Sequence, residues 1–411
     1  MIGGVGRGSV RRLGSADTLR HMSVYPLRGI IRPYAWGSRT ALAELQGRAA
    51  PTDQPEAELW LGAHPDDPAT VDRPGGPIGL NTLIAGDPAG QLGADVAAEF
   101  GPRLPYLLKV LAAGSPLSLQ AHPDSAYAKE AYARQQADPS APKNYTDAYH
   151  KPEMLVALTP FEALCGFRSP EKSAAALDAF GIAALAPIVG ALRAGDLRAA
   201  VRGLLTWPDA DRKPLIEAVV AAAKAAPSPD ADLAASLAGY YPGDPGVLVA
   251  LLLNHVRLAP GQAIWMPAGN LHAYLRGTGV ELMAASDNVL RGGLTPKRVD
   301  VDELLRVLVF EVLDDPILPA TPVAPGVETW AVPVRDFVLY GVDLDGSGPP
   351  IEVPAEGARI VVVVSGDVFV GQSVDGTPVD VPAGSAAYAP ASAGRIKLAG
   401  SGKAFVAAVR S

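Results

Sequence analysis

The stretch Ser118-Leu119-Gln120-Ala121-His122-Pro123-Asp124 decides how the rest of the sequence is interpreted. It follows an apolar run, residues 107–111, that has the composition of a buried strand. Gln120 and His122 are two residues apart, so on an extended strand their side chains lie on one face. An imidazole and an amide oxygen can both bind a divalent cation, and Pro123 ends the strand because it has no N–H for the ladder. The stretch predicts two metal ligands, with a hydrogen-bonded structural histidine as the alternative.

Two later stretches supply further ligand types. Glu153 opens a second apolar run, residues 153–158, that has the pattern of a buried strand, and His272 lies in the Pro- and Gly-flanked segment 258–274. An amide oxygen, two imidazoles and a carboxylate form a mixed ligand set that suits zinc, and also Mn²⁺ or Fe²⁺. The set contains no thiolate, so we expect a site with a position left for water or substrate. The four residues are Gln120, His122, Glu153 and His272. The alternative is four unrelated core residues.

Composition narrows the classes of protein to consider. The 411 residues suffice for two or three domains, and 48% of them are apolar, which is typical of a globular interior. The formal net charge is −8, no basic stripe of the kind that binds nucleic acid is visible, and no apolar run approaches the length of a membrane helix. Cys165 is the one cysteine, which excludes an internal disulfide and favours a reducing compartment. We therefore expect a cytoplasmic protein without nucleic-acid or membrane partners.

The pattern along the chain divides it into four parts. Residues 1–22 are rich in Gly, Arg and Ser and lack the apolar core of a secretory signal, so we expect a disordered tail. Ser169 is a good N-cap and Pro170 a good first helical residue, and helical spacing follows, so 169–254 is expected to be a helical insertion. Short strands with turns occupy the rest. The expected catalytic barrel covers 23–168 and 255–325, and the expected C-terminal barrel without a metal covers 326–411.

The two expected barrels share a sequence pattern. Gly261 precedes a short strand that closes on Pro267, and Gly384 precedes a strand that closes on Pro390 at the same offset, without a histidine. Residues 358–370 are expected to add two strands about a Ser-Gly-Asp turn. The pattern of the first segment is similar to that of jelly-roll metal barrels, the cupin class. We expect a mainly β fold with an α insertion: two cupin-like jelly-roll units, one with a metal, and a helical subdomain.

Four blocks of the sequence together carry a family resemblance. The blocks are Tyr34-Ala35-Trp36-Gly37 with Ala57-Glu58-Leu59-Trp60-Leu61-Gly62, the stretch at 118–124, Asn144-Tyr145 with His150-Lys151-Pro152-Glu153-Met154, and residues 279–297. They resemble the type I, cupin-barrel family of zinc-dependent mannose-6-phosphate isomerases, from about residue 24 to 310. Two positions depart from the family pattern: Tyr149 stands where the family usually has Asn, and Leu282 where Cys is common.

The resemblance implies a site as well as a fold. It implies that the same four ligand residues bind one zinc ion per chain, and that Arg291 is the catalytic arginine. Other active-site positions of the family are matched by Lys109, Ser118, Lys151, Glu281, Asp287 and Lys297. Arg291 and Lys297 would bind a phosphate, with Ser118 as a hydrogen-bond donor. Gly292-Gly293 would let the backbone approach a ligand closely.

The implied activity is an aldose–ketose isomerisation of mannose 6-phosphate and fructose 6-phosphate, by C1–C2 proton transfer through a cis-enediol. Lys151, Lys109 and Glu281 stay open as the general base, and Asp287 with His122 could serve ring opening. The partner is then a phosphosugar of mannose metabolism and GDP-mannose biosynthesis, and we expect a monomer. The alternatives are a cupin-type metal oxygenase and a non-catalytic phosphosugar-binding barrel.

Overall fold

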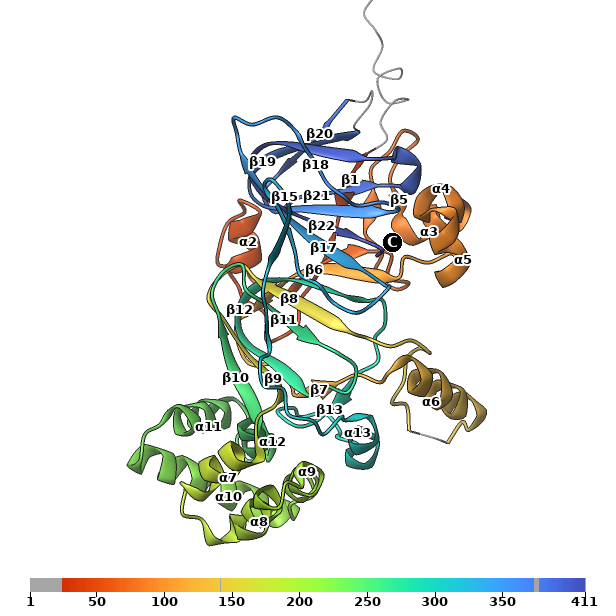
Figure 1. Ribbon diagram of the computed structural model, residues 1–411. Helices are drawn as coiled ribbons and strands as arrows, with labels where there is room; N and C mark the ends of the chain where they lie inside the picture. The colour runs from red at the N-terminus through yellow and green to blue at the C-terminus, as the bar shows by residue number, and fades with distance from the viewer. Residues whose placement is uncertain (1–23, 141, 373–376, 411) are drawn as a thin grey trace, which may run out of the picture.

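The computed structural model describes residues 24–140, 142–372 and 377–410, so the predicted tail over 1–22 lies outside it. Within these ranges the chain forms two large antiparallel sheets, with helices at their edges and at one end of the molecule. Figure 1 shows the three layers: the sheet with most of the C-terminal strands at the top, the other sheet in the middle and helices at the bottom. The expected mixture of mainly β structure with a helical insertion is confirmed.

The first sheet carries the predicted metal ligands. Its strands pair in the order β14-β11-β8-β12-β6-β3-β2. Strands β7 and β9 also pair with β12, and they pair in turn with β13 and β10. The strands are β2 (Ile30–Arg32), β3 (Glu58–Gly62), β6 (Tyr106–Ala113), β7 (Gln120–Ala121), β8 (Glu153–Ala157), β9 (Phe161–Phe167), β10 (Leu253–Leu258), β11 (Ala263–Met266), β12 (His272–Ala284), β13 (Leu290–Arg291) and β14 (Ile317–Leu318).

The second sheet combines both ends of the chain. Its strands are β1 (Tyr25–Arg28), β4 (Thr70–Val71), β5 (Ile78–Gly79), β15 (Thr321–Ala324), β16 (Val327–Thr329), β17 (Val338–Asp345), β18 (Ile351–Glu352), β19 (Arg359–Gln372), β20 (Val379–Pro382), β21 (Ala386–Ala389) and β22 (Ile396–Ala408). Strand β1 pairs with β21 on one side and β4 on the other. The predicted domain boundaries stay a prediction, but the pairing places β1, β4, β5 and β15, which come from the predicted catalytic barrel, in the second sheet.

Two expectations about the second sheet have different outcomes. Gly261 and Gly384 both have a positive φ and precede the short strands β11 and β21, as their shared sequence pattern predicts. The predicted pair of strands about Ser365-Gly366-Asp367 is wrong, because β19 continues through these residues as one strand. Strand β22 pairs with β19 along its whole length, and the register shifts between Val363 and Ser365. The Ser-Gly-Asp sequence is therefore paired strand that follows a bulge at Val364, rather than a reversal.

Helices surround the sheets. The helical insertion expected at 169–254 is present as helices α7 to α12. Helix α7 begins as predicted, with the Ser169 side chain accepting a hydrogen bond from the Lys172 N–H. The α-helices are α2 (Ala41–Leu45), α3 (Leu80–Gly86), α4 (Pro88–Leu92), α5 (Ala94–Phe100), α6 (Ser125–Ala137), α7 (Pro170–Asp178), α8 (Ala186–Arg193), α9 (Leu197–Leu205), α10 (Asp209–Ala225), α11 (Pro229–Tyr240), α12 (Gly246–Val249) and α13 (Val301–Val307). Short 3₁₀ turns cover Ala183–Leu185, Ala250–Leu252 and Ala391–Ala393.

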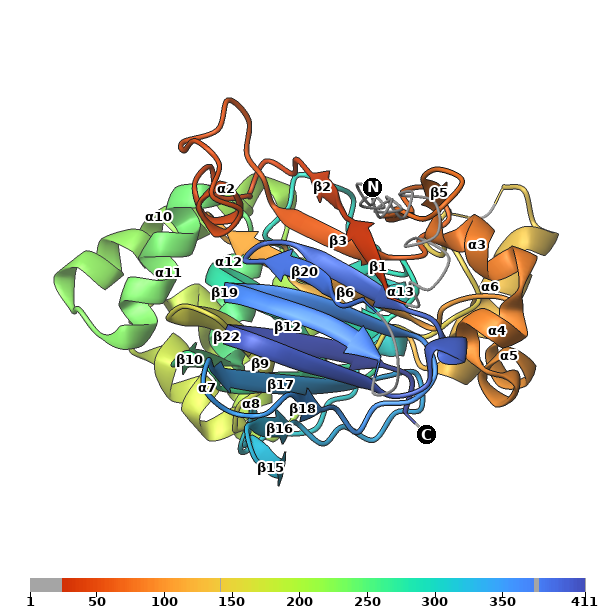
Figure 2. The same ribbon diagram turned by 90° about the horizontal axis from the view of Figure 1, so that it is seen from above.

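The two sheets stack on each other through a continuous apolar core. Val110 and Leu282 of the first sheet belong to the same buried cluster as Ile360 and Phe405 of the second. Figure 2, seen from above, shows β19, β22 and β17 lying across β12 and β6. Alternation along each strand then directs the remaining side chains of the first sheet away from the second sheet, into the interior that the first sheet encloses. The first sheet and this interior are called the first unit below. Lys109 and Glu281 are among those inward residues, because they alternate with Val110 and Leu282.

Strand β12 links the two parts of the first sheet. Its first half pairs with β7 and β9, and its second half pairs with β6 and β8. The change of partners coincides with a register shift between Tyr274 and Arg276 and with a positive φ of 122° at Gly277. The predicted ligand strand over 117–122 is shorter than expected, since only Gln120–Ala121 forms β7, but it lies directly beside β12.

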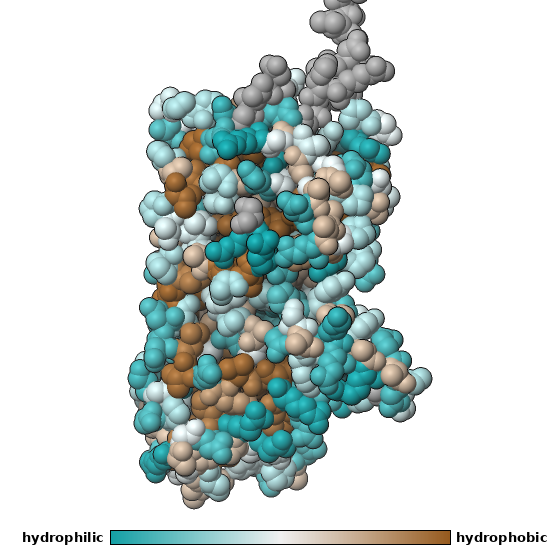
Figure 3. Space-filling model, turned by 45° about the vertical axis from the view of Figure 1, so that its right-hand side comes forward, coloured by the Kyte–Doolittle hydropathy of each residue, from teal (hydrophilic) through white to brown (hydrophobic). Residues whose placement is uncertain are grey.

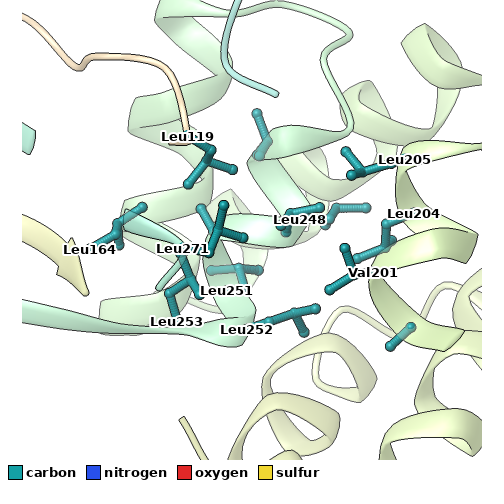
Figure 4. Close-up of a cluster of buried hydrophobic side chains, with 14 of the residues drawn as sticks. Leu119, Leu164, Val201, Leu204, Leu205, Leu248, Leu251, Leu252, Leu253 and Leu271 are labelled. Carbon is teal, nitrogen blue, oxygen red and sulfur yellow. The ribbon is translucent and has the colours of Figure 1, made fainter. Parts of the chain in front are cut away.

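The helical insertion packs behind the strands that carry the predicted ligands. Figure 4 shows Leu119 and Leu271 packed among leucines of the 3₁₀ turn Ala250–Leu252 and of helices α9 and α12. Each of these two leucines is the chain neighbour of a predicted ligand, Gln120 or His272. Because successive strand residues point to opposite faces, burying the leucines against the helices turns the ligands toward the interior of the sheet. The insertion therefore anchors the ligand strands from behind.

The outer surface is mixed in polarity. On the face drawn in Figure 3, hydrophilic residues are interspersed with small hydrophobic patches. Among the described residues, no helix combines the length and the apolar character that a membrane span requires.

Gly277 is expected to be essential for the change of partners in β12. A Cβ at this position would lie 2.7 Å from the Phe161 ring and 2.8 Å from the Pro160 carbonyl oxygen. Gly277→Ala should lower the free energy of unfolding by about 2–4 kcal/mol, because left-handed strain and overpacking add. Gly47→Ala is the matched control, since Gly47 has a φ of 62° but no neighbour within 4 Å. Equal midpoints for the two variants in urea denaturation would contradict this assignment.

Candidate metal centre and cleft

Three of the predicted ligands meet inside the first unit. His122, Glu153 and His272 are buried, and their ligand atoms all lie within 4.8 Å of one another. The two carboxylate oxygens of Glu153 face different histidines: Oε1 lies 3.5 Å from His122 Nε2, and Oε2 lies 3.2 Å from His272 Nε2. The three residues come from segments that are far apart in sequence, so the arrangement is a product of the fold. The cluster has the residue types and the spacing of a metal site.

The hydrogen bonds of the two histidines test whether a cation fits. His122 Nδ1 donates to the Asn288 carbonyl oxygen at 2.6 Å, and His272 Nδ1 donates to the Asn270 carbonyl oxygen at 3.1 Å. A carbonyl can only accept, so Nδ1 carries the proton and Nε2 carries a lone pair. Both Nε2 atoms are buried without a hydrogen bond and face the Glu153 oxygens. Lone pairs that face carboxylate oxygens repel unless a cation lies between them, so the cluster fits a divalent metal.

The protonation states of the cluster also suit a metal. Burial lowers the pKa of His122 to about 4, so its imidazole is neutral at neutral pH. Burial would raise the pKa of Glu153, but the Lys151 ammonium group holds it well below the usual range. Lys151 Nζ lies 3.2 Å from Glu153 Oε1. Since metal ligands must be deprotonated, the cluster needs to lose no proton to bind a cation.

Gln120, the fourth predicted ligand, lies beside this cluster. In the strand register its partner is His272 on one side and Arg291 on the other. Directly opposed residues in an antiparallel pair share a face, so the Gln120 side chain is directed to the same side as His272. Its role as a ligand stays a prediction that this register supports.

The cluster lies at the base of a cleft of about 820 Å³ that collects the other predicted site residues. His122 and His272 are buried beneath it, whereas Gln120 and Glu153 reach its surface. The predicted catalytic and phosphate-binding residues that line it are Lys109, Ser118, Lys151, Glu281, Asp287, Arg291 and Lys297. Every residue that the sequence proposed for the site is therefore brought to one place.

A buried ion-pair network forms one wall of the cleft. Lys109 Nζ lies 2.9 Å from Glu281 Oε2 and 3.5 Å from Glu58 Oε1. Burial would lower the pKa of Lys109, but Glu281, Glu58 and Glu153 together raise it, so this lysine keeps its proton. Tyr274 donates its hydroxyl proton to Glu281 Oε1 at 2.7 Å. Burial raises the pKa of Glu281 although Lys109 opposes the shift.

Two further cations that line the cleft, Arg291 and Lys297, have no such partners within the described residues. Arg32 pairs with Asp67, and Lys151 pairs with Glu153. Within the described residues, Arg291 and Lys297 are the remaining lysine and arginine side chains of the cleft, and neither forms an ion pair with a carboxylate. Burial lowers the pKa of Arg291, and no nearby charge offsets that cost. An anion in the cleft would be attracted to Arg291 and Lys297, and the part of the cleft that they line is called its phosphate end below.

Backbone hydrogen bonds place the unpaired arginine near Ser118. Leu119 N–H donates to the Gly293 carbonyl, and Gly292 N–H donates to the Leu119 carbonyl. Ser118 precedes Leu119, and Arg291 precedes Gly292, so the two side chains project from adjoining segments. Gly293 has a φ of 111° and approaches the backbone of Gly246, where a Cβ would lie 2.6 Å from the Gly246 Cα. The sequence predicted that Gly292-Gly293 lets the backbone approach a ligand closely. In the structure the backbone that Gly293 approaches is that of Gly246, in the helical insertion.

Several residues of the site were not identified from the sequence as functional. Glu58, Trp60 and Tyr274 line the cleft and contact the predicted residues. His64 also lines it, with Nε2 at 2.7 Å from Asp287 Oδ2. A signal for His64 exists, because Ala63-His64-Pro65-Asp66 repeats the tetrapeptide at 121–124.

Asn288 joins the loops that carry the candidate ligands and bases. Its carbonyl oxygen accepts from His122, and its amide nitrogen donates at 2.9 Å to the carbonyls of Asp147 and Tyr149. Its amide oxygen accepts from the Thr146 N–H at 2.9 Å. The segment that it holds leads directly into Lys151 and Glu153. The completely buried Asn288 therefore fixes the position of His122 relative to the segment that carries Lys151 and Glu153.

Comparisons with known proteins identify relatives over most of the chain. Residues 24–170 match the family model described as phosphomannose isomerase type I, catalytic domain. The chain is 36% identical over 362 residues to the mannose-6-phosphate isomerase of Escherichia coli (strain K12), covering 82% of this chain and 88% of that one. It is 32% identical over 402 residues to the human mannose-6-phosphate isomerase, covering 89% and 93%.

Solved structures give the same result. A variant of the phosphomannose isomerase from Salmonella typhimurium superposes with a TM-score of 0.88 at 32% identity, covering 95% of this chain and 100% of that one. A structure described as mannose 6-phosphate isomerase in the holo, zinc-bound form superposes with a TM-score of 0.87 at the same identity and coverage. The predicted cupin-type fold is confirmed by this agreement.

Asn288→Ala is expected to weaken divalent-cation binding by about 10–100-fold, because the backbone carbonyl that orients His122 stays but loses the side-chain amide bonds that fix its position. Chelator competition measures the affinity directly and does not depend on turnover. Asn144→Ala is a matched control, since its amide nitrogen also joins two loops, by a 3.1 Å bond to Asp300, but touches no ligand segment. Unchanged metal affinity in the Asn288 variant would show that the loops hold their positions without it.

Proposed function

The chain belongs to the phosphomannose isomerase type I family, and on that premise we propose that it interconverts mannose 6-phosphate and fructose 6-phosphate. The observation that carries the proposal is that a metal cluster and two unpaired cations line one cleft. The two alternatives, a metal oxygenase and a non-catalytic barrel, are unsupported by the comparisons. An oxygenase would also have no use for the two unpaired cations.

Zinc is the metal that the family relationship and the ligand set both favour. His122, Glu153 and His272 would hold it, with Gln120 as the fourth ligand. When bound, Zn²⁺ polarises the sugar oxygens on C1 and C2 and so stabilises the negative charge that develops there. The ion pair with Glu153 holds the Lys151 ammonium group beside the metal cluster, where it can donate a hydrogen bond to a substrate oxygen.

The phosphate group is assigned to the end of the cleft with unpaired positive charge. Arg291 offers two parallel N–H donors to a phosphate, and Lys297 adds a second charge. Ser118 projects from the segment that is hydrogen-bonded to the arginine loop. Since the protein as a whole is acidic, these two cations supply the local attraction that a dianion needs. The sugar would then extend from this end toward the metal cluster.

Glu281 is our choice for the proton carrier between C1 and C2. Burial raises its pKa toward the working pH, which favours a group that must both accept and return a proton. Lys109 is excluded as the base, because the surrounding carboxylates keep it protonated. Its ion pair instead fixes one oxygen of Glu281, while Tyr274 fixes the other. Lys151 stays the alternative base.

Asp287 is assigned to ring opening, in which a proton must leave the C1 hydroxyl. Its side chain is partly exposed in the cleft, with 42% of its surface accessible. The sequence also suggested His122 for this step, but both nitrogens of that ring are committed, one to Asn288 and one to the metal cluster. Asp287 alone is therefore placed to reach the sugar.

Two further expectations from the sequence are kept as part of the proposal. A monomer is sufficient, since all the residues assigned above come from one chain. A reducing, cytoplasmic setting fits a chain whose single cysteine, Cys165, is buried and unpaired.

Removing the metal tests the first part of the proposal. Treatment with a strong chelator should abolish the isomerisation of mannose 6-phosphate, and stoichiometric Zn²⁺ should restore it, because the charge that stabilises the developing oxyanion would be lost with the metal. A coupled assay on protein whose zinc content is measured provides the check. Full turnover in verified metal-free protein would refute the metal role.

Replacing Arg291 tests the phosphate assignment. Arg291→Ala should lower kcat/KM by about 10²–10³-fold, since a preorganised charge is lost, while the free energy of unfolding changes by about 1 kcal/mol or less. Arg298→Ala is the control, because Arg298 is nearby but pairs with Asp300 and does not line the cleft. Turnover near that of the unmodified protein in the Arg291 variant would count against the assignment.

A further inference from the structure

His64 is a cleft residue to which the function described so far gives no part. Its side chain is 11% exposed, and its ring packs 4.7 Å from that of Trp60 at the edge of the ion-pair network. Nε2 lies 2.7 Å from Asp287 Oδ2 across a sequence separation of 223 residues. This contact joins His64 directly to Asp287, the residue assigned to ring opening.

The other ring nitrogen fixes the tautomer. His64 Nδ1 lies 3.2 Å from the Asp66 backbone nitrogen and 3.4 Å from that of Asp67, and both of these groups can only donate. Nδ1 is therefore an unprotonated acceptor, and the proton of the neutral ring is on Nε2. The short contact is an N–H of His64 donating to the carboxylate of Asp287. The loop at 64–67 thus prepares a donor and aims it at Asp287.

Asp287 is held from two directions and free in a third. Its backbone N–H donates to Asp147 Oδ2 at 2.9 Å, and its Oδ2 accepts from His64. Oδ1 takes part in no hydrogen bond within the described residues. A carboxylate fixed in this way presents one oxygen to the cleft in a defined direction, as an acceptor for a sugar hydroxyl requires.

We propose that His64 is a positioning residue for ring opening, whose Nε2–H holds the Asp287 carboxylate so that Oδ1 faces the C1 hydroxyl of the substrate. The inference rests on the proposed function, in which Asp287 accepts that proton. The proton moves from the C1 hydroxyl to Oδ1 while the C1 carbonyl forms and the C1–O5 bond breaks, and the ring oxygen takes up a proton from water. The histidine keeps its own proton throughout. His64 therefore acts through Asp287 and contacts no reacting atom.

The charges around the pair agree with this role. Burial raises the pKa of Asp287, the hydrogen bond from His64 is the largest opposing effect, and the net shift is downward. Lys151, in the loop before β8, and Lys109, in β6, lower the pKa further. The acidic groups on the same loop as His64 are Asp66 and Asp67, and Asp67 is paired with Arg32. Loss of the His64 donor should leave Asp287 protonated at higher pH, and so inactive as an acceptor there.

Two substitutions separate the contact with Asp287 from the contacts within the loop. The Gln side-chain nitrogen in His64→Gln lies near the position of Nε2 and can still donate to Asp287, but Gln cannot accept from the loop amides. The Asn oxygen in His64→Asn lies near the position of Nδ1 and can still accept from the loop, but Asn cannot reach Asp287. A positioning role predicts that Asn is the damaging change, and a purely structural role in the loop predicts that Gln is.

The readout is the primary isotope effect with 2-deuterated mannose 6-phosphate, together with the pH profile of kcat/KM. In His64→Asn, kcat/KM should fall about 10–100-fold, the isotope effect should shrink toward unity because ring opening becomes limiting, and the acidic limb should move to higher pH. His64→Gln should recover most of the lost rate. His255→Asn, at the other end of the first unit beside Glu162, is the control that leaves all three quantities unchanged.

A test that needs no turnover keeps the inference separate from the proposed function. The Asp287 carboxyl pKa, followed by carbon NMR, should rise in His64→Asn and recover in His64→Gln. Unchanged pKa and unchanged isotope effect in His64→Asn, or greater damage in His64→Gln than in His64→Asn, would overturn the inference. An unmodified protein that leaves mannose 6-phosphate unchanged would overturn the proposed function, while the NMR result would still decide whether His64 holds Asp287.

Discussion

Strand β12 hydrogen-bonds to β7 and β9 along its first half and to β6 and β8 along its second half, and the site depends on that register. The register sets His272 beside Gln120, Glu281 beside Lys109, and Met283 beside Glu153. Because the side-chain period of a strand is two, a slip of one residue would turn all of these groups to the opposite face. The apolar neighbours Leu271 and Leu282 lock the register, since each is buried on the far side against a different layer.

The interior that β12 crosses is charged at one end and apolar at the other. Phe161, Leu155 and Val256 belong to a closed hydrophobic cluster, whereas three glutamates and two lysines are buried beside the ligands. Buried charges are costly unless they are paired, and here the pairing is nearly complete without the substrate. The exceptions among the buried groups are the histidine lone pairs at the metal cluster. Outside the buried set, the half-buried Arg291 and the exposed Lys297 form no ion pair within the described residues. A dication and a phosphate dianion would satisfy these two deficits, so the protein's unpaired groups match its proposed ligands.

Sequence and structure agree where the chemistry is encoded locally. Gln120, His122, Glu153 and His272 could be found because each lies in or beside a strand marked by Pro or Gly, and three of them meet as expected. The membership of β1 in the second sheet could not be found, because its partner β21 lies more than 350 residues away and no local pattern specifies the pairing. The Ser-Gly-Asp sequence of β19 was misinterpreted for a related reason. Such a sequence suits both a turn and a paired strand segment, and only the presence of β22 alongside decides between them.

The tetrapeptide Ala-His-Pro-Asp occurs twice, at 63–66 and 121–124, and the two histidines have opposite chemistry. At His122 the group facing Nδ1 is a carbonyl, so Nδ1 is protonated and Nε2 has a lone pair for a metal. At His64 the groups facing Nδ1 are backbone amides, so Nε2 is protonated and donates to Asp287. The side chains and their chain neighbours are the same, and only the backbone groups around the ring differ. Which histidine binds a metal and which holds a carboxylate is therefore decided by the fold, one hydrogen bond away from the functional atom.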